Sequence, residues 1–442
     1  MAADDSDLHC SGVVRITVDG LSTKALVTDA LHDELIIGWQ NLEDLGVIPK
    51  DFPRVGSCHT VSVLSTSTLQ CPPTFVADLL HTFDHVFSDT LPETALKGPS
   101  MKIHLKEGAV PRAVSTTKQI PHHWRDTADI TLKKLLDDGI IEQVPIEEPC
   151  DWISPAFFVP KADGKSLRLV TDFSYLNRFV RRPVHPFPSA SQIMQAIPPG
   201  SQVFAKLDAV QGYHQIPVDI SSRKLTTFLL PSGRYRYKRG PMGLCSTNDE
   251  WCFRSDVVVA DVPGCNKIVD DILVAAPDYE ELKNRLHTVL TRCASAGLVI
   301  SKKKLNIGSD LSFAGFRVSS QGISADPTKT KAITDFPRPE SVKDVRSFLG
   351  MANQLGCFVH DLAMVTAPIR ALLKKDTAFI WTSTQGEAFR KIKDILTSTQ
   401  VLSYFDSSLR TTILTDASKL YGLGFALIQT KPDGTTNLVQ CG

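Results

Sequence analysis

Apolar runs separated by short polar or glycine-containing breaks recur along most of the 442-residue chain. In the most informative run, residues 267–274, two adjacent carboxylates (Asp270 and Asp271) interrupt a series of Val, Ile and Leu. Such a run predicts a buried strand, whose side chains point alternately to opposite faces. Asp270 and Asp271 therefore cannot both face the core, and a buried carboxylate is costly without a cation or partner. We expect a tight turn between two strands, with the carboxylates turned either to a metal ion or, as in an ordinary hairpin, to solvent.

A second apolar run, residues 204–208, ends in Asp208 and passes through Gly212 into another apolar alternation. Ala162-Asp163-Gly164 is a strong turn signal between two apolar strands, and Ser232-Gly233 is predicted as a second hairpin turn. Alternation predicts strands at residues 13–18, 101–105, 152–161, 167–173, 226–230, 235–239, 412–418 and 422–428. Helical spacing and helix-end signals predict helices at residues 75–83, 121–138, 189–196, 245–253, 279–297 and 388–398. Aromatic and basic residues alternate within 235–239, which predicts a strand with one cationic face.

The order of motifs points to a family. Asp208, then Gly-Tyr-His-Gln-Ile at residues 212–216, then the Asp270-Asp271 pair resembles the palm of a reverse transcriptase. The closest family by this resemblance is the Pol polyprotein of gypsy-type LTR retrotransposons. The resemblance implies an α+β right-hand polymerase fold with fingers, palm and thumb, a ribonuclease H-like α/β start at the C-terminus and a β-rich retropepsin remnant at the N-terminus.

The same resemblance divides the chain into parts. The expected parts are a truncated retropepsin-like remnant at 1–55, a linker at 56–100, reverse transcriptase fingers and palm at 101–325, a thumb or connection at 326–375, and a truncated ribonuclease H-like domain at 376–442. The Asp-Thr-Gly or Asp-Ser-Gly loop of a retropepsin occurs nowhere in the sequence. Asp416 matches the first carboxylate of a ribonuclease H site, and the others lie beyond the end of this sequence. We therefore expect neither protease nor ribonuclease H activity from these residues.

The resemblance also assigns site residues. It implies that Asp208 and Asp270 bind two Mg²⁺ ions (Mn²⁺ being an alternative) and that Asp271 supports one of them. It implies contacts with the incoming nucleotide from Lys161, Arg168, Tyr213 and Lys304, with Tyr213 excluding a sugar 2′-hydroxyl, and a primer grip containing Phe313 and Gly315. Each of these side chains also has a plainer interpretation. Lys161 and Arg168 fit solvated charges on two strands, and Lys304 fits a solvated charge run. Tyr213 fits a half-buried strand aromatic, and Phe313 fits a buried β-ribbon.

Three segments depart from the family pattern. Ile268 stands where most reverse transcriptases have Tyr, and residues 245–253 differ from the usual Asn-Ala-Pro-Ala-Thr-Phe-Gln helix. Residues 354–358 lack the two basic residues of the usual Tyr-Tyr-Arg-Arg-Phe run, which should weaken contacts with a duplex. The resemblance implies an active RNA-directed DNA polymerase. These departures keep a second hypothesis open, in which the chain is a catalytically inactive nucleic-acid-binding remnant of a decayed element.

Charge and cysteine content bear on the compartment and the partners of the chain but do not decide its function. Net charge is zero overall, but the first hundred residues are acidic and residues 101–330 carry a small excess of Lys and Arg. The 10 cysteines show no zinc-ligand spacing, and neither a signal peptide nor a membrane-length apolar run is predicted.

The partners that the resemblance implies are an RNA template, a DNA primer, their hybrid and dNTPs. The resemblance implies a cytoplasmic, particle-associated location with an optional nuclear stage, and it leaves the oligomeric state open.

Overall fold

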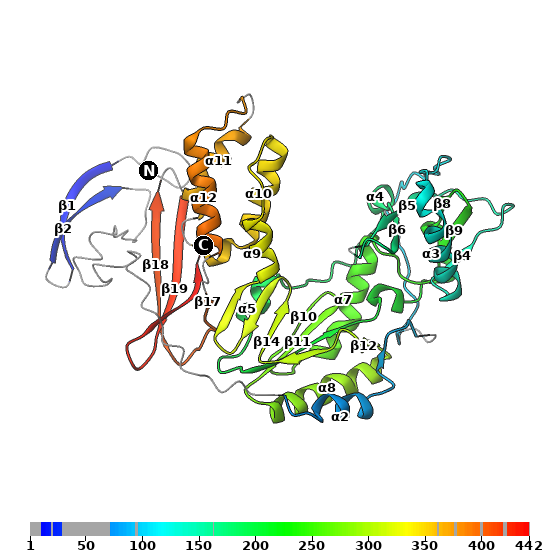
Figure 1. The fold of residues 1–442 in the computed structure, drawn as a ribbon, viewed down its shortest axis with the longest axis horizontal. Coiled ribbons are helices and arrows are strands. Elements are labelled where there is room, and N and C mark those ends of the chain that lie inside the picture. Colours follow the sequence, from blue (N-terminus) through cyan, green and yellow to red (C-terminus); the bar gives the residue numbers. More distant parts are fainter. Residues whose placement is uncertain are drawn as a thin grey trace. The chain divides into compact units, whose positions relative to one another are not determined.

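The computed structural model describes residues 10–18, 21–28, 71–92, 96–161, 163–359, 362–374, 378–397, 401–418 and 422–441. Side chains of residues 10–28, 416–418 and 422–423 lie outside this description. Residues 69–321 form one compact unit, and residues 1–68 with 322–442 form another. Figure 1 shows the ribbon of both units, with many of the helices and strands labelled.

A five-stranded sheet in the 69–321 unit corresponds to the predicted fingers, with strand order β4-β9-β8-β5-β6. Its strands are β4 (Ile141–Gln143), β5 (Ser154–Pro160), β6 (Leu167–Thr171), β8 (Phe228–Leu230) and β9 (Gly233–Tyr237). Helix α3 (Arg125–Asp137) follows the 3₁₀ helix η1 (His122–Trp124) and packs against β4 and β6. Gly139, with a φ of 63°, comes just after α3, as expected for a residue that ends a helix.

A four-stranded antiparallel sheet forms the predicted palm, in the order β10-β11-β7-β13. Its strands are β7 (Val203–Asp208), β10 (Cys265–Ile268), β11 (Asp271–Ala276) and β13 (Asn306–Gly308). The two central strands, β7 and β11, are almost wholly buried. Burial on both faces explains why both read as nearly continuous apolar runs in the sequence.

Helix α8 (Tyr279–Ala296) packs against β7 and β11 of the palm sheet. Its buried face has the predicted helical spacing and includes Leu282, Leu286, Leu290 and Cys293. Helix α2 (Phe75–Thr82) lies beside α8 (Figure 1), and the rings of Phe75 and Tyr279 meet edge-on with 5.5 Å between centroids. Both helices occur where the sequence predicted them.

Helix α7 (Cys245–Val259) packs beside α8 and β10 and extends beyond the predicted helix at residues 245–253. Shorter elements complete this unit: β3 (Phe87–Ser88), α4 (Ser174–Asn177), α5 (Ala190–Gln195), η2 (Gly212–Gln215), α6 (Ile220–Arg223), η3 (Lys224–Thr226), β12 (Ile300–Ser301), β14 (Asp310–Phe313) and β15 (Phe316–Ser319). Strands β3 and β12 pair in parallel, whereas β14 and β15 form a hairpin.

The other unit combines helices with short sheets. Its elements are β1 (Cys10–Val18), β2 (Leu21–Thr28), β16 (Gly322–Ala325), α9 (Pro327–Thr334), α10 (Val342–Gln354), η4 (Gly356–Phe358), α11 (Leu362–Arg370), η5 (Ala371–Leu373), α12 (Ser383–Thr397), β17 (Val401–Leu402), β18 (Arg410–Ser418), β19 (Gly422–Thr430) and β20 (Thr436–Cys441). Phe348 of α10 packs on Phe389 of α12 with 4.6 Å between ring centroids. Strands β18, β19 and β20 form an antiparallel sheet.

Some local predictions are wrong. Residues 101–105 form no strand but make two isolated bridges, Met101 to Val218 and Leu105 to Val180. Met101 and Ile103 are buried, so the apolar alternation there reflects a one-sided contact with the core. The predicted turn at Ser232-Gly233 lies one residue earlier, because Leu230 pairs with Gly233.

The cationic strand face predicted for residues 235–239 is neutralised at Arg236. Arg236 donates from Nε to Glu142 Oε1 at 2.6 Å and also forms an ion pair with Glu148. Arg234 donates from Nη1 to the carbonyl oxygen of Glu148 at 2.9 Å. The positive charge of β9 is therefore engaged within the fold, by β4 and the loop after it.

The N-terminal strand predicted at residues 13–18 is confirmed, since β1 pairs antiparallel with β2. Residues 1–9, 19–20 and 29–55, which together make up the larger part of the predicted retropepsin remnant, lie outside the described residues. The remnant itself therefore stays a prediction.

Candidate active site

The turn between β10 and β11 consists of Val269 and Asp270, because Ile268 pairs with Asp271. The predicted tight turn is thus present. Val269 has a φ of 52°, which is strained for a β-branched residue. Two-residue hairpin turns usually place glycine or asparagine at positive φ. The strain is concentrated at the residue directly before Asp270, and such strain is characteristic of functional sites.

Asp208 and Asp271 lie directly opposite each other on β7 and β11. Opposed residues of an antiparallel pair share a face of the sheet, with Cβ atoms about 4.5–5.5 Å apart. Asp270 lies beside them, because its carbonyl oxygen accepts a hydrogen bond from the backbone N–H of Ala209 at 3.1 Å. Carboxylates that are 62 residues apart in the sequence are therefore brought to one end of the palm sheet.

Two lysines contact these carboxylates. Lys304 Nζ donates to Asp208 Oδ1 at 2.7 Å, and Lys206 Nζ lies 3.2 Å from Asp271 Oδ1. The second contact is an ion pair only, since Asp271 Oδ1 is buried with no donor aligned on it. Among the described residues, Asp270 forms no ion pair within 4 Å. The cluster therefore holds three carboxylates against two ammonium groups.

Burial raises the pKa of both Asp270 and Asp271 above the usual range of an aspartate. The charge of Asp208 raises both further, while Lys206 acts in the opposite direction on both. A carboxylate whose pKa is raised by burial and by like charge lacks a sufficient counter-charge. A divalent cation would supply that charge.

Tyr213, the predicted sugar gate, lies in η2. Its hydroxyl donates to Asn248 Oδ1 at 2.8 Å, and its ring meets Trp251 edge-on with 6.3 Å between centroids. Burial raises the pKa of Tyr213 to about 12, and the charge of Asp270 contributes to the rise. Tyr213 is therefore within electrostatic reach of the palm turn.

The predicted triphosphate contacts lie elsewhere in the same unit. Arg168 is exposed on β6 opposite Val159, and Lys161 is exposed just after β5. Asp163 holds the turn between these strands by accepting hydrogen bonds from the backbone N–H groups of Lys165 and Ser166, each at 2.9 Å. No contact in the described part of the chain joins Lys161 or Arg168 to the palm carboxylates. Their role stays a prediction.

The predicted primer grip forms the turn of the β14–β15 hairpin. Ala314 and Gly315 both have positive φ, at 52° and 85°. Phe313 is completely buried, and Lys206 Nζ lies 5.9 Å from the centroid of its ring. Phe313 therefore supports the turn from inside the core, and Gly315 lies in the turn itself. Asp416, the predicted ribonuclease H carboxylate, pairs with Gly424 through its backbone, and its side chain lies outside the described residues.

Sequence reasoning missed Lys206, Asn248 and Trp251. Lys206 precedes Asp208 by two positions on a strand, so the period-2 rule could have placed it on the same face. Asn248 and Trp251 are three positions apart on a helix, but nothing in the sequence shows that this face meets Tyr213.

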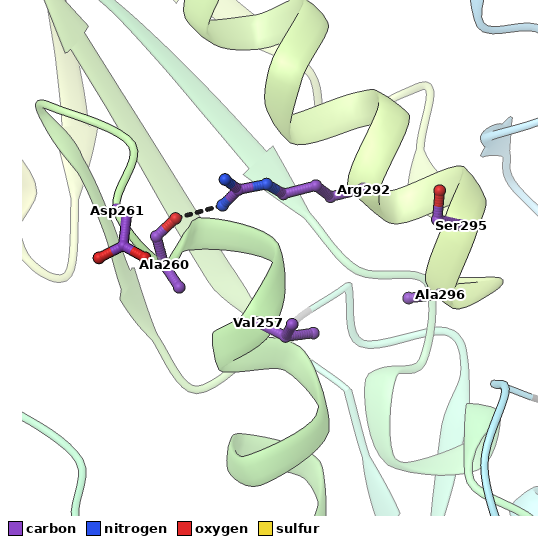
Figure 2. Close-up of a pocket in the computed structure, with 6 residues that line it drawn as sticks. All are labelled: Val257, Ala260, Asp261, Arg292, Ser295 and Ala296. Carbon is purple, nitrogen blue, oxygen red and sulfur yellow. Dashed lines mark hydrogen bonds between the residues drawn. The ribbon is translucent and has the colours of Figure 1, made fainter.

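A separate pocket lies at the carboxyl ends of α7 and α8 (Figure 2). Its lining comprises Val257, Ala260, Asp261, Arg292, Ser295 and Ala296. Arg292 donates a hydrogen bond to the carbonyl oxygen of Ala260 at one side of the pocket. None of the predicted site residues lines this pocket, and its surface is largely apolar, so it is not the candidate active site.

The palm cluster fits a hard divalent cation in its donor chemistry. Mg²⁺ prefers carboxylate oxygens and keeps several water ligands. Asp271 Oδ1 is a buried acceptor without an aligned donor, which is the kind of atom a cation would satisfy. As they stand, no three carboxylate, His or Cys side chains in the described ranges converge closely enough to hold an ion. Lys304, whose side chain is 63% exposed, would have to move away from Asp208 for a cation to bind there.

Two stretches of the chain match known families. Residues 159–351 match the reverse transcriptase (RNA-dependent DNA polymerase) family, and residues 381–442 match the RNase H-like domain found in reverse transcriptase. The first stretch contains all three palm carboxylates together with Lys304. The chain therefore carries a reverse transcriptase domain followed by an RNase H-like domain.

Among curated proteins, the chain is similar to retrotransposon polyproteins. The transposon Tf2-3, Tf2-4 and Tf2-7 polyproteins of Schizosaccharomyces pombe are each 27% identical to this chain over 428 residues, which is 95% of this chain and 31% of the relative. The chain thus spans about a third of the length of these relatives. The resemblance to retrotransposon Pol polyproteins, predicted from the motifs, is confirmed.

Solved structures support the same fold. A foamy viral protease-reverse transcriptase, in its dRH form in complex with double-stranded DNA, aligns over 97% of this chain and 75% of its own, with a TM-score of 0.74 and 17% identity. The foamy viral protein in complex with an RNA/DNA hybrid aligns over 97% and 58%, with a TM-score of 0.73 and 18% identity. At these identities the likeness establishes the fold alone, and it confirms the predicted polymerase architecture. Separately, no helix in the described ranges has the length and apolarity needed to cross a membrane.

Proposed function

We propose that this chain is an RNA-directed DNA polymerase that transfers a nucleotide from a dNTP to the 3′-hydroxyl of a DNA primer on an RNA template. The observation that carries the proposal is that Asp208, Asp270 and Asp271 lie at the same end of the palm sheet. The family match over residues 159–351 supports the same reaction. The foamy viral structures in complex with double-stranded DNA and with an RNA/DNA hybrid support nucleic acid as the partner.

Asp208 and Asp270 would hold two divalent cations, with Asp271 supporting one of them. When bound, the cations supply charge stabilisation for the attacking and leaving oxygens. Mg²⁺ suits the carboxylate donors, and Mn²⁺ could replace it. Asp271 keeps its ion pair with Lys206, which would hold its carboxylate facing the cluster.

The remaining residues would orient the nucleotide. Lys304 would move from Asp208 to pair with the leaving pyrophosphate, because its side chain is exposed and a phosphate offers more negative charge than one carboxylate. Lys161 and Arg168, exposed at the β5–β6 hairpin, would contact the triphosphate. Tyr213 would exclude a ribonucleotide by clash with its 2′-hydroxyl. From the family resemblance we also propose a cytoplasmic, particle-associated location with an optional nuclear stage.

The test is primer extension by the purified chain on poly(rA)/oligo(dT), with dTTP and Mg²⁺. We expect Asp208→Asn and Asp270→Asn each to lower the rate by several orders of magnitude, because both remove charge that holds the cations. Asp261→Asn is the matched control, since Asp261 is an exposed aspartate of the same unit that lines the separate pocket. Extension by Asp270→Asn at the rate of the unsubstituted chain would show that the palm assignment is wrong.

The second candidate function is that of an inactive nucleic-acid-binding remnant. The altered helix at residues 245–253 and Ile268 in place of Tyr favour it. This candidate predicts that the purified chain binds an RNA–DNA hybrid but extends no primer. Measuring binding and extension on the same purified chain therefore distinguishes the polymerase from the inactive remnant.

We also propose that these 442 residues alone have no protease or ribonuclease H activity. The sequence contains no Asp-Thr-Gly or Asp-Ser-Gly triplet, and Asp416 is the one carboxylate that matches a ribonuclease H site. A single carboxylate binds Mg²⁺ weakly, because this ion is usually held by protein groups together with substrate phosphates. Cleavage of the RNA strand of a labelled hybrid that is lost on Asp416→Asn would contradict this proposal.

A further inference from the structure

One face of helix α7 contacts both the predicted sugar gate and the palm turn. Asn248 and Trp251 are three residues apart, so they project from the same side of the helix. Asn248 Oδ1 accepts the hydrogen bond from the Tyr213 hydroxyl at 2.8 Å. Trp251 packs edge-on against the Tyr213 ring and donates from Nε1 to the carbonyl oxygen of Val269 at 2.8 Å. The gate and the turn that carries Asp270 therefore share one support.

The backbone around Tyr213 is closely confined. A Cβ atom on Gly212 would lie 2.9 Å from the Trp251 ring, and a Cβ atom on Gly240 would lie 2.7 Å from the Tyr213 carbonyl oxygen. With the backbone held in this way, the position of the Tyr213 ring depends on rotation of its side chain. The hydrogen bond to Asn248 is the contact that fixes the far end of that side chain.

We propose that Asn248 is a positioning residue for sugar selection: by holding the Tyr213 hydroxyl, it keeps the ring where it excludes a ribonucleotide. The inference rests on the proposed function, because it requires a nucleotide to bind beside Asp208 and Asp270. Exclusion by clash depends on a barrier that cannot move aside, and an untethered ring is free to rotate away from a 2′-hydroxyl. Asn248 lies in the segment that departs from the family pattern, and the resemblance assigns it no role.

The competing interpretation is that the hydrogen bond only stabilises the fold. A purely structural bond would alter stability or the rates of both nucleotides together, and it would leave their ratio unchanged. The informative readout is therefore the ratio of kcat/KM for dTTP to that for UTP in single-nucleotide incorporation on poly(rA)/oligo(dT).

Tyr213→Phe and Asn248→Ala remove the same hydrogen bond from its two ends. We expect each to lower the dTTP/UTP ratio roughly three- to tenfold, the change that corresponds to one lost hydrogen bond. The double variant should equal either single variant, because both substitutions remove one shared interaction. Asn248→Asp keeps the acceptor oxygen and should keep most of the discrimination. Asn284→Ala, at an exposed position on α8, is the control and should change nothing.

The outcomes distinguish failure of the proposed function from failure of the role of Asn248. Absence of extension by the unsubstituted chain contradicts the proposed function itself. Normal extension with an unchanged dTTP/UTP ratio in Asn248→Ala, or additive losses in the double variant, overturns the role of Asn248 alone. If Asn248→Ala fails to fold, Tyr213→Phe tests the same bond with the ring retained, and an unchanged ratio there also overturns the inference.

Discussion

Lys267 Nζ lies 2.9 Å from Asp256 Oδ1, and the two side chains differ in burial, with Lys267 4% exposed and Asp256 40% exposed. Lys267 also donates to the carbonyl oxygen of Val269 at 3.2 Å, the same oxygen that accepts from Trp251. Two donors thus hold the strained residue of the palm turn. They explain how a valine keeps a positive φ at a position that usually takes glycine.

The unequal burial of this pair predicts an unequal response to substitution. Asp256→Asn should lower the free energy of unfolding by about 3 kcal/mol, because it leaves a buried ammonium without its counter-charge. Lys267→Met should cost less, about 1–1.5 kcal/mol, because it gives up one of the two hydrogen bonds to Val269 but leaves Asp256 partly in water and paired with His185. Denaturant unfolding of both variants measures the difference. Equal losses would show that the burial of Lys267 does not control the energetics of the pair.

The predicted sugar gate gives a direct test of Tyr213. Tyr213→Ala should admit ribonucleotides with little loss of dTTP incorporation, because a gate that works by clash is relaxed when it is shortened. Single-nucleotide incorporation with dTTP and UTP provides the measurement. Unchanged discrimination would mean that Tyr213 is a half-buried aromatic without a role in sugar choice.

Gly212 tests the support of the gate from its other side. Gly212→Ala should reduce primer extension and stability together, because the new methyl group would lie 2.9 Å from the Trp251 ring and must displace it. Gly350→Ala is the matched control. Gly350 lies inside α10 with open space around its Cα, so alanine there should be neutral or stabilise by about 0.5–1 kcal/mol. Full activity in Gly212→Ala would show that the position of Trp251 is not critical.

His214 predicts a dependence of stability on pH. Burial lowers the pKa of its imidazole from 6.5 to about 4, with a smaller lowering by Arg239 and an opposing hydrogen bond to the carbonyl oxygen of Gly240. The unfolded chain therefore takes up this proton before the folded chain does. The contribution is fully present above pH 6.5 and is lost as the pH falls toward 4, which amounts to about 1–2 kcal/mol by pH 5.

The measurement is the free energy of unfolding of the unsubstituted chain and of His214→Gln at pH 7 and pH 5. The glutamine variant lacks the titrating group, so its stability should fall less between the two pH values. An identical fall in both proteins would assign the acid sensitivity to other groups.

Local pattern was enough to predict the palm strands that carry the three carboxylates and the helix that packs against these strands. The spacing of Leu282, Leu286 and Leu290 predicted the buried face of α8, and the apolar run around Asp270 and Asp271 predicted strands with a tight turn. These features depend on side-chain direction and burial over a few residues, which the sequence specifies directly. The order of Asp208 and the Asp270-Asp271 pair then identified the family.

The partners of the polar side chains were decided by tertiary structure. The sequence predicts that Arg236 contributes to a cationic strand face, yet it binds Glu142, which lies 94 positions earlier. Lys304 reaches Asp208 across 96 positions, and Tyr213 reaches Asn248 across 35. Each of these contacts depends on how distant strands and helices are packed and in which register, whereas the periodicity of one segment reports only which of its own faces is buried.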